Sequence, residues 1–175
     1  MLKRFSGDPR GVAAVEFALI APVMILLYCG MAELTMAMMA ERQAAHSASV
    51  VGDLVAQSTR VSGSQMTDMF NVGVAILKPF PAATLRMRVS SVKADANGVP
   101  RVVWSQGYGL GALAANGTPS GFPANLLAAG DSVIQADVSY TYTSPIQQVI
   151  PNPITYADSF YLKPRRSPEV AWAGP

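Results

Sequence analysis

The most informative stretch of this chain of 175 residues is Arg10-Gly11-Val12-Ala13-Ala14-Val15-Glu16-Phe17-Ala18-Leu19-Ile20-Ala21-Pro22-Val23-Met24-Ile25-Leu26-Leu27-Tyr28. It is an apolar run of the length and composition of a membrane helix, with one carboxylate, Glu16, near its start. Burying an ionised carboxylate in hydrocarbon costs several kcal/mol on most scales, so an acid at this position is expected to have a specific partner. The sequence therefore predicts a membrane helix in which Glu16 has a role.

The charges on either side of this run predict its orientation. The basic residues that precede it are Lys3, Arg4 and Arg10, and the acidic residues that follow it are Glu33 and Glu41. The positive-inside rule then keeps the N-terminus in the cytoplasm and exports the rest. The uncharged residues between Glu16 and Glu33 rise by about 24 Å, less than a hydrocarbon core of about 30 Å. Glu33 and Glu41 are expected to mark the outer interface of this membrane, on the exported side, without a chemical role.

The segment from Arg10 to Ala40 resembles the N-terminus of type IV prepilins. The segment is similar to the TadE-like minor pilins (pseudopilins) of tight-adherence (Flp) pili in its motif Ala14-Val15-Glu16-Phe17-Ala18-Leu19, followed by Pro22. The resemblance covers the apolar helix and is weak beyond it, so a TadE-like and a TadF-like identity are not separated.

This resemblance implies a cleavage site and an assembly role. A membrane-embedded prepilin peptidase is expected to cut between Gly11 and Val12, so that Glu16 becomes the fifth mature residue and Phe17 the sixth. In such pilins the acid at this position is proposed to pair with the new amine at Val12 of a neighbouring subunit. The implied partners are the peptidase, other major and minor pilins, the inner-membrane assembly platform and the lipid bilayer. A simpler interpretation of Glu16 is that it snorkels to the cytoplasmic interface.

The pattern divides the chain into four parts. Residues 1–11 are the expected leader, and residues 12–62 hold one transmembrane and periplasmic helix, continuous from about Val12 to Thr59. Its outer half has an apolar stripe made of Ser47, Ala48, Val51, Leu54 and Val55. Residues 63–163 form an exported α+β domain, and residues 164–175 are expected to be an extended, loosely held tail.

The exported domain begins with a second amphipathic helix, with Ser64 as its expected N-cap and Pro79 as its stop. From Thr84 the period changes to two, which predicts a half-buried strand with one apolar and one polar face. Its apolar face holds Leu85, Met87 and Val89, and its polar face holds Arg86, Arg88 and Ser90. Asp95-Ala96-Asn97-Gly98 predicts a turn between two paired strands.

The longest predicted strand alternates Ile134, Ala136, Val138, Tyr140 and Tyr142 with polar residues, and a final strand covers Thr155 to Leu162. We expect a four-stranded, mostly antiparallel sheet with its apolar face on the outer half of the long helix.

Composition argues against several functions. The net charge of +2 does not favour nucleic acid as a partner. Cys29 is the single cysteine and His46 the single histidine, and no catalytic or metal-ligand motif is present, so neither an enzyme nor a cofactor or metal is expected. The alternatives to a structural pilin are an unprocessed, membrane-anchored accessory or binding protein and, least expected, an anchored hydrolase.

Overall fold

The structure is a computed structural model that describes residues 9–119 and 121–174, with the backbone alone for residues 9–11. It forms two compact units. One consists of the helix up to Met38 with the loop Thr143–Pro153, and the other of Met39–Tyr142 with Ile154–Pro175. Most of the predicted leader, including Lys3 and Arg4, lies outside the described residues.

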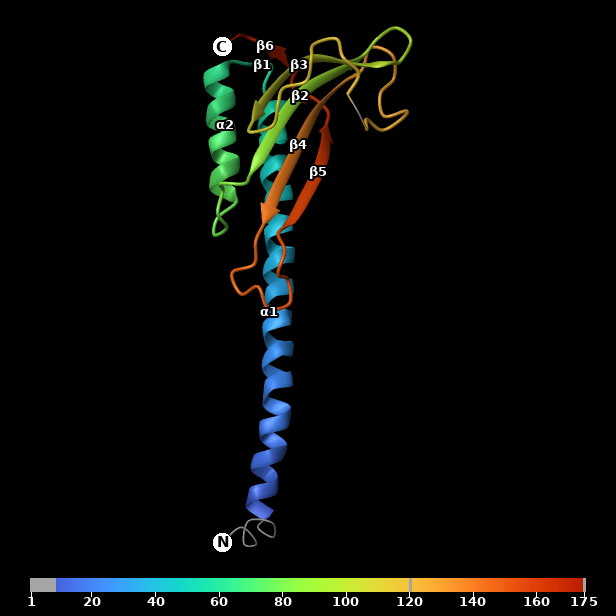
Figure 1. The fold of residues 1–175 in the computed structure, drawn as a ribbon. Helices are drawn as coiled ribbons and strands as arrows, with labels where there is room; N and C mark the ends of the chain where they lie inside the picture. Colours follow the sequence, from blue (N-terminus) through green and yellow to red (C-terminus); the bar gives the residue numbers. More distant parts are fainter. Residues whose placement is uncertain (1–8, 120, 175) are drawn as a thin grey trace. The chain divides into compact units, whose positions relative to one another are not determined.

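Helix α1 runs from Pro9 to Ala56 and contributes to both units (Figure 1). Pro9 occupies the first helical position, where its missing N–H costs nothing and its fixed φ suits the helix. Pro22 lies inside the helix and removes one backbone N–H there. The predicted continuous helix is confirmed, and it ends three residues before the expected Thr59.

The larger unit contains a four-stranded antiparallel sheet in the order β3-β2-β4-β5 (Figure 1). The strands are β2 (Arg86–Ala94), β3 (Pro100–Tyr108), β4 (Ser132–Tyr142) and β5 (Ile154–Leu162). The predicted turn joins β2 to β3, and Gly98 adopts a φ of 77° there. The α+β architecture with a long apolar helix, a second helix and this sheet is thus confirmed.

Helix α2 (Gly63–Ile76) begins one residue after its cap. The Ser62 hydroxyl accepts from the Gln65 N–H at 3.3 Å, and the Gln65 side chain accepts from the Ser62 N–H at 3.0 Å. This reciprocal pair is a capping box, which satisfies two backbone donors at once. The prediction of Ser64 as N-cap is therefore wrong, because Gln65 stands three residues after Ser62.

Two glycines let both helices approach one face of the sheet. A Cβ on Gly52 of α1 would lie 2.9 Å from the Cβ of Ala136 on β4, and one on Gly73 of α2 would lie 2.9 Å from Met87 Sδ on β2. Both distances are shorter than ordinary van der Waals contact, so the two backbones pack closer than alanine allows. Since Ala136 and Met87 belong to the predicted apolar face, the predicted direction of that face is confirmed.

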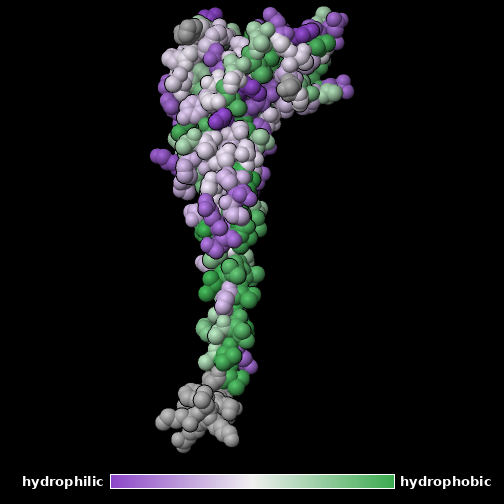
Figure 2. Space-filling model, viewed as in Figure 1, coloured by the Kyte–Doolittle hydropathy of each residue, from purple (hydrophilic) through white to green (hydrophobic). Residues whose placement is uncertain are grey.

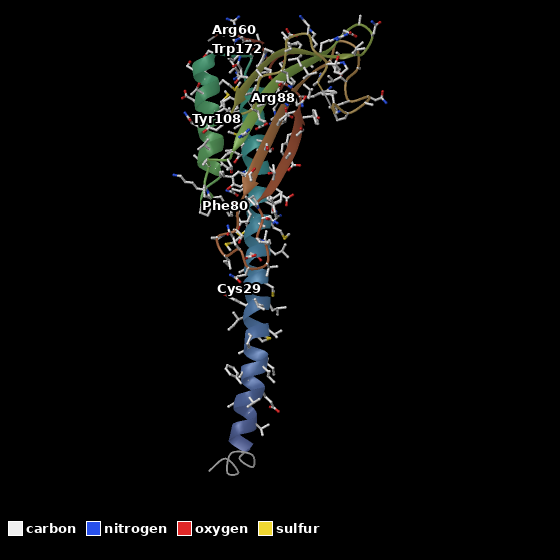
Figure 3. All side chains as sticks on the ribbon, in the orientation of Figure 1. Cys29, Arg60, Phe80, Arg88, Tyr108 and Trp172 are labelled. Carbon is white, nitrogen blue, oxygen red and sulfur yellow. The ribbon has the colours of Figure 1, made fainter. Side chains whose placement is uncertain are left out.

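The opposite face of the sheet is covered in part by the loop between β3 and β4. A small apolar cluster lies there, formed by Val92, Ala94, Val102, Leu127 and Val133, with Leu113, Phe122 and Tyr161 packed against it. Beside it, Asp137 pairs with Arg88 of β2 at 2.8 Å and accepts from Gln135 and Ser159 (Arg88 in Figure 3). These contacts satisfy a carboxylate that is almost fully buried.

The C-terminal tail is held by the larger unit, so the prediction of a loosely held tail is wrong. Strand β6 (Ala171–Trp172) pairs in parallel with β1 (Arg60–Val61), and Val170 is fully buried. The indole N–H of Trp104 donates to the Val170 carbonyl at 2.7 Å, and the rings of Trp104 and Trp172 lie 5.5 Å apart. The partners of this tail are distant in sequence, and the local pattern therefore did not reveal them.

Candidate functional site

The first two thirds of α1 expose apolar side chains instead of burying them. This helix is long and apolar enough to cross a membrane by length and composition. Figure 2 shows its surface as predominantly hydrophobic. The large apolar side chains that are more than half exposed on it are Val12, Val15, Phe17, Leu19, Ile20, Val23, Met24, Ile25, Leu26, Leu27, Tyr28, Met31, Leu34, Met38 and Met39. An exposed apolar surface of this extent marks a membrane or protein interface.

The residues predicted to act in cleavage and assembly lie at the start of this surface. The backbone is helical through Gly11 and Val12. Glu16 is exposed, and Phe17 is 73% exposed. Val12 and Glu16 are four residues apart, which places them on one face of the helix, about 6 Å apart along its axis. Among the described residues, Glu16 forms no ion pair or hydrogen bond with another side chain.

Glu33 is in a different environment from the one predicted. Its side chain is fully buried, and its carboxylate accepts three successive backbone N–H groups from the loop Thr143–Pro153. The donors are Gln148 at 2.7 Å, Val149 at 3.0 Å and Ile150 at 2.6 Å. Glu33 is therefore buried under this loop, whereas Glu41 is exposed, and that the two acids mark the outer interface of the membrane stays a prediction.

The loop approaches α1 closely because the helix has a glycine one turn before Glu33. A Cβ on Gly30 would lie 3.1 Å from the Cγ2 atom of Val149, tighter than most contacts of that kind. The loop is also ordered from within, since the Ser144 hydroxyl accepts from the N–H groups of Ile146 and Gln147, both at 3.3 Å. Gly30 thus allows the loop to approach the helix, and Glu33 holds it there by hydrogen bonds.

Glu33 resembles Glu16 in its sequence surroundings. An acid inside an apolar run needs a partner, and Glu33 is followed by apolar residues up to Ala40 apart from Thr35. What the sequence did not reveal is that the partner is a loop more than one hundred residues later.

A broad hollow lies in the larger unit beside the β2–β3 turn. Its volume is about 790 Å³, and its lining includes Lys93, Asp95 and Arg101. The charged groups are engaged locally, with Lys93 paired to Glu169 at 2.7 Å and Arg101 to Asp95 at 3.6 Å. Hydrogen bonds from the N–H groups of Val99 and Asn97, assisted by Arg101, hold the pKa of Asp95 below its ordinary value against the opposing effect of burial. These contacts explain the turn and point to no ligand.

Comparison with known protein families gives a match in the helix. Residues 11–52 match the family model described as TadE-like protein. The N-terminal segment of this chain is TadE-like. The TadE-like segment includes Gly11, Glu16, Phe17 and Glu33, and it ends at Gly52, before α2 and the sheet. The search of curated proteins and that of solved structures gave no significant match. The link to the tight-adherence system therefore rests on the helix.

Proposed function

We propose that this chain is a structural minor pilin, a pseudopilin, that acts in assembly, initiation or tip formation of a tight-adherence pilus. The observation that carries the proposal is the exposed apolar surface of α1, which begins at Val12 and has one exposed carboxylate, Glu16, four residues later. The TadE-like match of residues 11–52 covers this surface. A helix of this kind suits a protein that is first held in a membrane and later packed among other helices.

In this proposal the N-terminus is cytoplasmic, the larger unit is exported, and a prepilin peptidase cleaves between Gly11 and Val12. Cleavage creates a positive amine at Val12. In the low dielectric of packed helices, the amine of one subunit and the Glu16 carboxylate of the next stabilise each other, because neither charge is stable there unpaired. Phe17 contributes apolar contact beside this pair. The role is structural and not catalytic.

Processing is tested by the intact mass of the membrane-extracted chain, expressed with and without an active prepilin peptidase. The wild-type chain should begin at Val12 when the peptidase is present. Gly11→Val should retain residues 1–11, because a bulky side chain prevents close seating of the backbone. A wild-type chain that keeps residues 1–11 when it is expressed with an active peptidase would favour an unprocessed anchored protein and contradict the pilin proposal.

Assembly is tested at Glu16. Glu16→Gln keeps the shape and removes the charge, so the chain should still insert and be cleaved but should co-purify less with partner pilins. Glu16→Asp should retain more recruitment than the Gln variant, since it keeps the charge with a shorter reach. Wild-type recruitment and piliation of the Gln variant would instead support the snorkelling interpretation.

A further inference from the structure

The loop Thr143–Pro153 has an unusual backbone for a surface loop. Pro145, Pro151 and Pro153 have no N–H to satisfy. Five further N–H groups are bonded within the smaller unit: those of Ile146 and Gln147 to Ser144 Oγ, and those of residues 148–150 to the Glu33 carboxylate. Eight of the eleven residues thus have no free N–H. Water is not needed to satisfy these N–H groups, which lowers the cost of placing this backbone at the edge of a membrane.

The loop exposes one large apolar side chain, Val149, next to the polar side chains of Gln147 and Gln148. None of its residues is charged. Val149 is 54% exposed, although it is a large apolar residue at the tip of the loop. On α1, where the loop is seated at Gly30 and Glu33, Met31, Leu34 and Met38 are exposed as well. Val149 therefore adds to the apolar surface of the helix, and the exposed amides beside it suit the headgroup region.

Burial of Glu33 changes the length of the apolar span. With this carboxylate withdrawn from the surface, the exposed part of α1 is without charge from Phe17 to Ala40. The rise over these residues is about 36 Å, enough for a hydrocarbon core of about 30 Å. Two residues in this stretch carry a hydroxyl: Tyr28, which is exposed, and Thr35, which donates to the Met31 carbonyl at 2.8 Å. The next charges, Glu41 and Arg42, are exposed and suit the headgroup region.

We propose that the loop Thr143–Pro153 is itself a lipid-binding element: it lies in the membrane at the end of the α1 span, with Val149 among the acyl chains, and Glu33 holds it there. The partner is the apolar edge of the bilayer. The inference goes beyond the role of the pilin and requires only that α1 be inserted in a membrane. It assigns Glu33 a positioning role, since a carboxylate bonded to three N–H groups is far less costly in this setting than a free one.

The experiment uses the purified full chain with Cys29→Ala, reconstituted in phosphatidylcholine vesicles. An environment-sensitive fluorophore is attached at Val149→Cys, and the matched control is Val99→Cys, an exposed valine at the β2–β3 turn. Leu27→Cys in the exposed apolar part of α1 reports insertion of the helix. Quenching by lipids that carry a nitroxide on the acyl chain is then compared among the three sites.

The fluorophore at position 149 should be quenched several-fold more than the one at position 99, and Glu33→Ala should lower its quenching toward that of position 99. Equal quenching at 149 and 99, with strong quenching at 27, would overturn the lipid contact. Shielding from water without lipid quenching, together with crosslinking between copies at 149, would overturn it in favour of a second chain. Unchanged quenching in Glu33→Ala would overturn the role of Glu33. Absence of quenching at position 27 would refute the membrane span, whereas failure of processing or recruitment alone would leave this result intact.

Discussion

Gly52→Ala tests how closely α1 packs on the sheet. The added Cβ would lie 2.9 Å from the Cβ of Ala136 and 2.8 Å from the Cδ1 atom of Leu162. The leucine can change rotamer, but the Cβ of Ala136 is fixed to the backbone of the central strand β4. The helix or the strand must therefore shift.

Two effects of opposite sign set the magnitude. Replacing glycine by alanine inside a helix stabilises it by about 1 kcal/mol. Overpacking a close contact typically costs about 1–3 kcal/mol. Because the obstructing atom cannot rotate away, we expect a cost in the upper part of this range, about 2–3 kcal/mol, and thus a net loss of about 1–2 kcal/mol. For a unit of this size such a loss lowers the Tm by about 3–8 °C.

The assay is thermal unfolding of the full chain in detergent, followed by tryptophan fluorescence. The chain has two tryptophans, and both Trp104 and Trp172 lie in the unit that contains the sheet. Gly111→Ala is the matched control, since a Cβ there meets no atom within 4 Å, and its Tm should stay near that of the wild type. A Gly52→Ala variant as stable as the wild type, or more stable, would refute the close helix–sheet contact.

Three further predictions concern the larger unit. Val138→Asp places an unpaired charge on the buried face of β4 and should prevent folding, whereas Thr141→Asp on the opposite face should be tolerated; equal circular dichroism melts of the two variants would show that the register is wrong. Asp95→Asn should weaken the loss of stability at acid pH. The pKa of Asp95 is lowered in the folded state, so its carboxylate stabilises the fold at pH values above its ordinary pKa of 3.8. This contribution is lost as the pH falls through the folded pKa, and the Asn variant has no such contribution to lose. Urea titrations across that range measure it, and an unchanged loss of stability at acid pH would contradict the turn contacts. Trp172→Ala should lower the urea midpoint by an amount equivalent to about 2 kcal/mol, because it removes the ring packed on Trp104; a wild-type midpoint would show that the tail contributes nothing.

Some elements of the fold have signals that are local in the sequence. The apolar run after Gly11 is sufficient for the membrane-grade helix, because hydropathy and length decide it without reference to a partner. The alternation of apolar and polar residues in β2 and β4 predicted which side chains face the helices, since successive side chains of a strand point to opposite faces. Residues Asp95 to Gly98 predicted the turn between β2 and β3, because Asp, Asn and Gly favour turn conformations.

The tertiary structure decided what depends on residues far apart in the chain. Glu33 looked like a boundary charge, and the fold buries it under a loop that supplies three N–H groups. Gly52 carries no apolar signal, yet it allows the contact between α1 and the central strand. The tail looked loose because Val170 and Trp172 find their partners, Trp104 and β1, only after the sheet has formed. The physical reason is common to all three: hydrogen bonding and close packing between distant segments leave no periodic trace in the local sequence.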